Sequence, residues 1–226
     1  ALKGNPQSLQ ARLGLAIAYN RAGRIEEAFQ AYQKVLAQDP QNQAALKIVG
    51  MMGTYRSEWN KPGINALNTL LELNPNDLQS RYYRALLYSY QGQFAESIAD
   101  FQIVLANNPT PEAIIGAAQT YSYSGDYQKA KELFNRYKAS GKPIKDYAAV
   151  AYALTLRKTG NPQEAIAILQ RQLQGSQTLD QLAILARAEL SQAYIANKQE
   201  AQALAVLEPL EDREEAILPL ARSLNE

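Results

Sequence analysis

The chain has 226 residues, with 23 Lys and Arg against 22 Asp and Glu, and it contains neither cysteine nor histidine. These absences exclude disulfides, thiol nucleophiles and zinc-thiolate sites, and they remove the commonest general base and metal ligand. The net charge is only +1, and the charged residues of both signs are spread along the sequence, so no basic patch that would bind nucleic acid is expected. No stretch approaches the roughly 18 consecutive apolar residues of a membrane span, so we expect no membrane insertion.

An internal period organises almost the whole chain, because three columns of similar residues recur with closely matching spacings. One column holds small residues: Ala28, Gly63, Ser97, Ala130, Ala165 and Ala203. The column four positions later is bulky: Tyr32, Leu67, Phe101, Phe134, Leu169 and Leu207. A third column reads Tyr19, Gly53, Tyr88, Tyr121, Leu156 and Tyr194. The agreement of three columns predicts a repeat architecture.

Each period predicts two amphipathic helices. Apolar residues recur at i, i+3, i+4 and i+7 over residues 9–19 and again over 25–36. Glycine-containing turns separate the two helices at Gly23, Gly92, Gly125 and Gly160. Prolines at 40, 75 and 109 end the second helices, because the residue before a proline is disfavoured in a helix. The second period has an unusual turn over 56–62, where we expect Trp59 to pack between units, with an exposed anchor as the alternative.

This pattern resembles the tetratricopeptide repeat, a family with a period of about 34 residues, an aromatic in the first helix, glycine at the turn, alanine and then an aromatic in the second helix, and a closing proline. The resemblance implies an all-α fold, a right-handed α-α superhelix of about six helical hairpins plus a C-terminal capping helix. We expect the tail of a preceding repeat over 1–6, so that the chain is a segment of a longer protein, and the capping helix over 212–226. The repeats are expected over 9–42, 43–77 (atypical), 78–110, 111–145, 146–180 and 184–211.

The resemblance also implies a binding surface, because the first helices of this family line a concave groove, chiefly with their second, fifth, ninth, twelfth and thirteenth positions. The thirteenth position reads Arg21, Tyr55, Tyr90, Tyr123 and Lys158. The second, fifth and ninth positions add Lys47, Met51, Tyr82, Gln119 and Tyr147. Tyrosine combines flat apolar area with a hydroxyl and is enriched at binding surfaces. These ten residues are the candidate partner-binding site, with packing between repeats or plain solvent exposure as the alternative for the tyrosines.

Two other activities are not expected. Chaperone-binding members of the family hold a C-terminal carboxylate with Lys, Asn and Arg, but here the first window presents Leu13, Ile17 and Ile48, and no later window fits. The sequence has no phosphate loop, dinucleotide motif or histidine metal motif. We therefore expect no carboxylate-clamp binding of chaperone tails, no enzyme activity, no cofactor and no metal.

The sequence thus predicts a non-catalytic protein-protein interaction scaffold that binds a peptide or partner protein in a Tyr-rich concave groove, within a larger bacterial assembly protein. The alternative is a polysaccharide-contacting segment of a bacterial exopolysaccharide or cellulose synthesis or export machine, where tyrosine rings stack on sugar rings. The lack of cysteine is compatible with either a bacterial cytoplasm or a periplasm.

Overall fold

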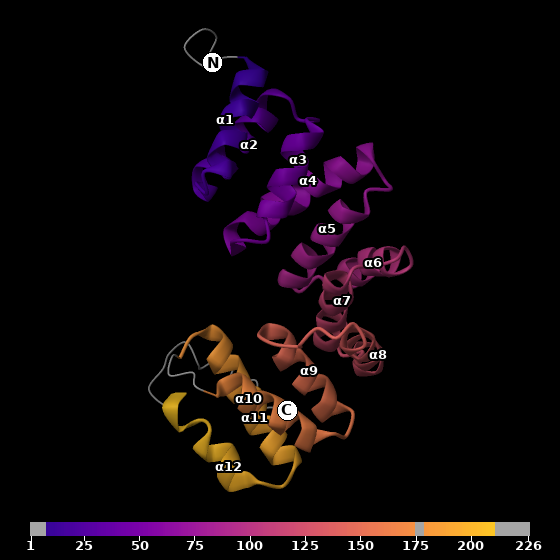
Figure 1. Ribbon diagram of the computed structural model, residues 1–226, viewed down its shortest axis with the longest axis vertical. Coiled ribbons are helices and arrows are strands. Elements are labelled where there is room, and N and C mark those ends of the chain that lie inside the picture. The colour runs from indigo at the N-terminus through magenta and orange to yellow at the C-terminus, as the bar shows by residue number, and fades with distance from the viewer. Residues whose placement is uncertain (1–7, 175–178, 211–226) are drawn as a thin grey trace. The chain divides into compact units, whose positions relative to one another are not determined.

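The computed structural model describes residues 8–174 and 179–210, and over these residues the chain is all-α, with no strand (Figure 1). The all-α fold expected from the repeats is therefore confirmed. Contacts between helices divide the chain into two compact units, Ala1–Pro109 (unit 1) and Thr110–Glu226 (unit 2). The repeat tail expected over 1–6 and the capping helix expected over 212–226 lie outside the described residues.

Unit 1 consists of helix pairs. Its helices are α1 (Leu9–Arg21), α2 (Ile25–Gln38), α3 (Gln43–Met52), α4 (Asn60–Leu73), α5 (Leu78–Tyr90) and α6 (Phe94–Leu105), with a 3-10 turn, η1 (Ser57–Trp59), before α4. Within the pairs, α1 packs on α2, α3 on α4 and α5 on α6 (Figure 1). The second helix of each pair contacts the first helix of the next, and α3 also contacts α5. Each pair therefore buries its apolar face against its neighbours.

Local sequence signals set the ends of these helices. Gly23 and Gly92 both have a φ of 70°, a left-handed conformation that glycine adopts without steric cost, and they reverse the chain after α1 and α5. The side chains of Asn42 and Asp77 accept hydrogen bonds from backbone N–H groups at the starts of α3 and α5. Short, well-defined turns therefore hold the first helices in place.

The residue columns recognised in the sequence form the core. All six members of the small column are buried, and so are the bulky-column residues Tyr32, Leu67, Phe101, Phe134 and Leu169. Burying a large apolar side chain contributes roughly 1.5–3 kcal/mol. The same columns that mark the period along the sequence therefore also stabilise each helix pair.

The second pair departs from this pattern because its helices approach unusually closely. A Cβ atom on Gly63 of α4 would lie 3.0 Å from the Cα atom of Gly53 and 2.9 Å from Cδ1 of Leu87. A Cβ atom on Gly50 of α3 would lie 2.3 Å from Cδ2 of Leu67. Only glycine can occupy such positions without a shift of the surrounding atoms.

Trp59 joins the first and second pairs. Its side chain is 5% exposed, and its ring stacks on Phe29 of α2 with the centroids 4.2 Å apart and the planes 9° from parallel. The Arg56 guanidinium lies 4.8 Å from the centroid of the Trp59 ring, a cation-π arrangement. The predicted packing role of Trp59 is confirmed.

A buried carboxylate ties α5 to α6 in unit 1. Asp100 is 3% exposed and accepts hydrogen bonds from Nε and Nη2 of Arg84, at 2.7 and 2.8 Å, and from Nη1 of Arg81 at 3.0 Å. Arg84 also donates from Nη1 to Oδ1 of Asn68 on α4 at 2.9 Å. The paired geometry of the Arg84 contact is the strong form of such an interaction.

Unit 2 repeats the arrangement with α7 (Pro111–Ser124), α8 (Tyr127–Lys138), α9 (Tyr147–Lys158), α10 (Pro162–Leu173), α11 (Gln181–Ala196), α12 (Glu200–Ala205) and a 3-10 turn, η2 (Glu208–Leu210). The first helices α7, α9 and α11 contact one another in turn. Between α7 and α9, the Ser122 hydroxyl donates to the Ala151 carbonyl at 2.8 Å, and the Thr155 hydroxyl donates to the Ser122 hydroxyl at 3.0 Å. These buried hydroxyls define how α9 lies along α7.

Candidate functional site

The predicted binding residues fall into two sets, one in each unit. In unit 1 the set comprises Arg21, Lys47, Met51, Tyr55, Tyr82 and Tyr90, which we call the unit 1 face. In unit 2 it comprises Gln119, Tyr123, Tyr147 and Lys158, the unit 2 face. Every member lies on the first helix of a pair, except Tyr55, which lies in the turn that follows α3. The first helices thus carry both faces.

Two tyrosines of the unit 1 face are exposed to an extent unusual for aromatic residues. Tyr55 is 52% exposed and Tyr90 is 57% exposed. Protein around the Tyr90 hydroxyl nevertheless disfavours its ionised form by desolvation and raises its pKa. Both rings are therefore open to solvent, and the protein near the Tyr90 hydroxyl favours its neutral form.

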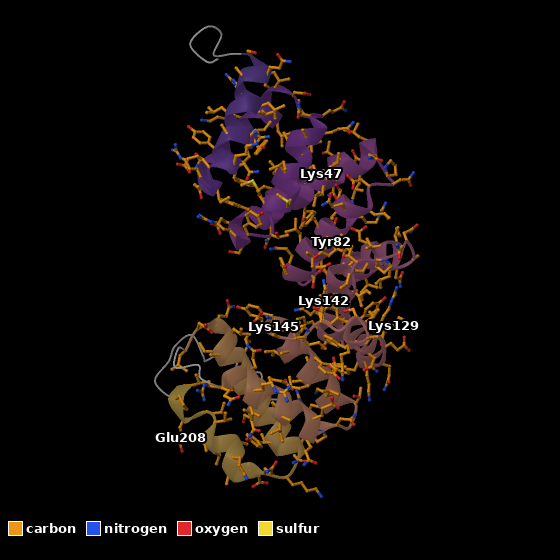
Figure 2. The ribbon with its side chains drawn as sticks, in the orientation of Figure 1. Lys47, Tyr82, Lys129, Lys142, Lys145 and Glu208 are labelled. Carbon is orange, nitrogen blue, oxygen red and sulfur yellow. The ribbon has the colours of Figure 1, made fainter. Side chains whose placement is uncertain are left out.

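Tyr82 is positioned differently, since it is half-buried on α5 (Figure 2). Its ring meets the buried ring of Phe101 edge-on, with the centroids 6.3 Å apart, and contacts Tyr83 at 5.2 Å. Met51 on α3 is half-buried as well. Tyr82 and Met51 therefore belong partly to the core, and they support the face rather than project from it.

The cations of the unit 1 face have different surroundings. Lys47, labelled in Figure 2, donates from Nζ to Oδ2 of Asp77 at 3.1 Å, and Asp77 also caps α5. Partial burial opposes ionisation of Asp77, but hydrogen bonds from Ser80 and Lys47 outweigh it, and the pKa of Asp77 stays below its ordinary value. Arg21 is exposed in the last turn of α1. Lys47 thus links α3 to α5, whereas Arg21 is open to solvent.

The unit 2 face brings together side chains from α7 and α9. Tyr123 is 42% exposed and Tyr147 is 44% exposed. Burial of the hydroxyl, followed by the negative charge of Glu189 and the proximity of Tyr147, raises the pKa of Tyr123 to about 12. The Tyr123 hydroxyl therefore stays neutral well above the pH at which an ordinary tyrosine ionises.

An ion pair adjoins these tyrosines, and the sequence did not predict it. Arg157 donates from Nε and Nη2 to the two carboxylate oxygens of Glu189, at 2.7 and 3.1 Å, and the two side chains are only 8% and 11% exposed. Gln119 is half-buried on α7, and Lys158 is exposed at the end of α9. Glu189 lies 32 positions after Arg157, which is close to one repeat period. That spacing was the only indication of the ion pair in the sequence.

Chemical groups for catalysis are sparse in the part of the chain that the structure describes. No cluster of three or more acidic residues there is placed to hold a metal ion. None of the helices described is both long and apolar enough to cross a membrane. The exposed groups of the two faces are aromatic rings and hydrogen-bonding side chains.

Comparison with known families identifies one type of repeat. A model of the tetratricopeptide repeat matches residues 1–43 and 115–178, and a second model of the same repeat matches residues 79–111. Together these matches cover more than half of the chain. They include the first helix pair, the third and much of unit 2.

Individual proteins give more distant similarities. The CTR9 homolog of Arabidopsis thaliana is 26% identical over 125 residues, which make up 53% of this chain but only 12% of that protein. A tetratricopeptide repeat protein from Parabacteroides merdae has a similar structure, with a TM-score of 0.66 at 20% identity over 99% of this chain and 88% of that one. YrrB, described as a TPR protein with an unusual peptide-binding site, gives a TM-score of 0.56 at 14% identity over 88% of this chain and 100% of its own. These structural similarities concern the fold.

Proposed function

Because the chain belongs to the tetratricopeptide repeat family, we propose that it is a non-catalytic scaffold whose unit 1 and unit 2 faces bind a peptide or a partner protein. The observation that carries this proposal is the exposure of Tyr55, Tyr90, Tyr123 and Tyr147, which lie 42–57% open to solvent on or next to the first helices. Aromatic area left in water contributes little to folding, and its concentration on one class of helix is typical of a binding surface.

The chemistry of the faces suits a polypeptide ligand. A tyrosine ring has few rotatable bonds, so fixing it on a ligand costs little entropy, and its hydroxyl can bond to peptide N–H or C=O groups. Arg21 near the end of α1 and the Lys47–Asp77 pair between α3 and the start of α5 add charged hydrogen-bonding groups to the first helices. YrrB, which has a peptide-binding site by its description, shows that a chain of this fold can take such a ligand. We further propose that this chain belongs to a larger bacterial assembly protein.

A glycan is the second candidate ligand, and one observation favours it in unit 2. Tyr123 and Tyr147 are both exposed, and Tyr147 and Glu189, which pairs with Arg157, both help to raise the pKa of Tyr123. Aromatic rings can cover the apolar face of a sugar while neighbouring charged groups bond to its hydroxyls. The unit 2 face is therefore the place to test polysaccharide binding.

The experiment compares variants of the two faces separately. Immobilised wild-type chain and the variants Tyr55→Ala/Tyr90→Ala and Tyr123→Ala/Tyr147→Ala are used to capture proteins from a bacterial lysate. Each captured protein is then purified, and its affinity is measured by calorimetry. Ile103→Ala on α6 is the matched control, because Ile103 is a 42% exposed apolar residue on a second helix.

The proposal predicts that at least one tyrosine variant loses the partner while the Ile103 variant keeps it. Equal affinity for wild type and both tyrosine variants would exclude these faces as the binding site. Binding of a cellulose or exopolysaccharide oligosaccharide, lost in Tyr123→Ala/Tyr147→Ala and with no protein captured, would favour the glycan.

A further inference from the structure

Asn60 is a buried polar side chain in the unusual turn of the second pair. It is 4% exposed, although it occupies the first position of α4 directly after η1. Its Nδ2 group donates to the Gly53 carbonyl at 2.8 Å and to the Arg56 carbonyl at 3.3 Å. These two carbonyls lie on either side of Tyr55 in the chain. One amide group therefore holds the backbone on both sides of an exposed ring.

The same side chain reaches the next helix pair. Oδ1 of Asn60 accepts a hydrogen bond from Nε2 of Gln91 at 2.8 Å, and Gln91 directly follows Tyr90 at the end of α5. Donor and acceptor atoms of Asn60 are thus both used, and they join the two chain segments that carry Tyr55 and Tyr90. An aspartate could not make the same set of bonds, because an ionised carboxylate only accepts.

We infer that Asn60, acting through Gln91, is a positioning residue that sets the separation and orientation of Tyr55 and Tyr90 for the ligand. The inference rests on the proposed binding role of the unit 1 face. The two rings project from different elements, one from a turn and one from a helix end, so backbone helix geometry alone does not relate them. A ligand that contacts both rings loses less entropy on binding if their spacing is fixed beforehand.

Two substitutions break this link in different ways. Gln91→Ala removes one exposed side chain and cuts the contact to α5, while Asn60 keeps both bonds to the turn. Asn60→Asp keeps the size of the side chain and an oxygen that can accept from Gln91, but it loses both donors, so the bonds to the turn around Tyr55 are lost. Gln30→Ala on α2 is the matched control, since Gln30 is an exposed glutamine with a single side-chain hydrogen bond, to Glu26 at 3.1 Å.

The test measures the spacing directly. The chain has no cysteine, so nitroxide labels can be attached at Tyr55→Cys and Tyr90→Cys without any other substitution. Dipolar electron paramagnetic resonance then gives the distribution of distances between the labels in the full chain. We expect a broader distribution when Gln91→Ala or Asn60→Asp is added, and no change when Gln30→Ala is added. If circular dichroism shows that Asn60→Asp unfolds the chain, Gln91→Ala alone decides.

Affinity provides the second readout, in proteins that keep both tyrosines. For a partner captured through the unit 1 face, Gln91→Ala should weaken binding roughly two- to tenfold, the range expected from mobilising one or two contact side chains. An unchanged distance distribution overturns the inference, whatever the ligand is. A broader distribution with unchanged affinity overturns it as well, because the spacing would then not matter for binding. If Tyr55→Ala/Tyr90→Ala itself leaves affinity unchanged, the proposed function of this face has failed instead.

Discussion

Replacing Gly63 by alanine tests the close approach of α3 and α4. In the interior of an exposed helix, alanine in place of glycine stabilises a protein by about 1 kcal/mol, because the unfolded chain loses freedom. At Gly63 the added Cβ atom would lie 2.9 Å from a flexible Leu87 methyl group but also 3.0 Å from the Cα atom of Gly53, which belongs to the backbone. The leucine can rotate away, whereas the backbone contact requires the two helices to separate.

The size of the effect follows from two opposing contributions. Overpacking of this kind costs about 1–3 kcal/mol, and the backbone contact puts Gly63 in the upper part of that range. After subtracting the helix-propensity gain of about 1 kcal/mol, we expect Gly63→Ala to lower the free energy of unfolding by about 1–2 kcal/mol. Gly14 on α1 is the matched control, because a Cβ atom there would meet nothing within 4 Å. Gly14→Ala should raise the free energy of unfolding by about 0.5–1 kcal/mol.

The assay is urea unfolding followed by the fluorescence of Trp59, the single tryptophan, which lies in η1 just before α4. The signal therefore reports on unit 1. Opposite shifts of the urea midpoint for the two alanine variants are expected. Equal stabilisation by both would refute the close approach of α3 and α4, since the same substitution would then meet open space at either position.

Two further predictions concern buried charge and pH. Asp100→Asn leaves two arginines without their carboxylate, so the free energy of unfolding should fall by about 3–5 kcal/mol in urea melts. Glu132→Gln, at an exposed ion pair, should change it by less than about 1 kcal/mol; similar losses from both would contradict the importance of burial. In an ultraviolet titration, Tyr123→Phe should remove a tyrosine that ionises near pH 12, and Glu189→Gln should lower the pKa of Tyr123. Since this pKa lies above the value of about 10 in the unfolded chain, the stability that it supplies is complete below about pH 10 and is lost as the pH rises toward 12. Ionisation of every tyrosine near pH 10 would rule out the desolvated site.

Much of the fold follows from periodicity, because burial on a helix is a local pattern that repeats. The small column and all of the bulky column except the half-buried Leu207 are buried, and the aromatic position of the first helix is filled in unit 2 by the buried Tyr121. The exposure of Tyr55, Tyr90 and Tyr123 could also be predicted from the sequence. Each lies two positions after a member of the third column, which begins with Tyr19. Whether these tyrosines bind a partner stays a prediction.

Periodicity could not predict which side chains pair with each other between helices. The contact between Asn60 and Gln91 depends on the geometry of an irregular turn, which no residue pattern encodes. Arg84 and Asp100 are 16 residues apart on antiparallel helices, and the sequence offers other acids at similar distances. Stacking of Trp59 on Phe29 likewise required the position of η1. Polar and aromatic pairs of this kind are chosen by three-dimensional proximity rather than by period.

The hydroxyls buried between α7 and α9 bear on how freely such repeats can be exchanged. Ser122 needs both the Ala151 carbonyl and the Thr155 hydroxyl, yet the position of Thr155 in the repeat is occupied by Leu87 in α5. A chimera with α5 grafted in place of α9 would set a leucine against a buried serine, and a design that averages the repeats would lose the pairing altogether. Helix pairs that look interchangeable in length and pattern are therefore each matched to the neighbour beside them.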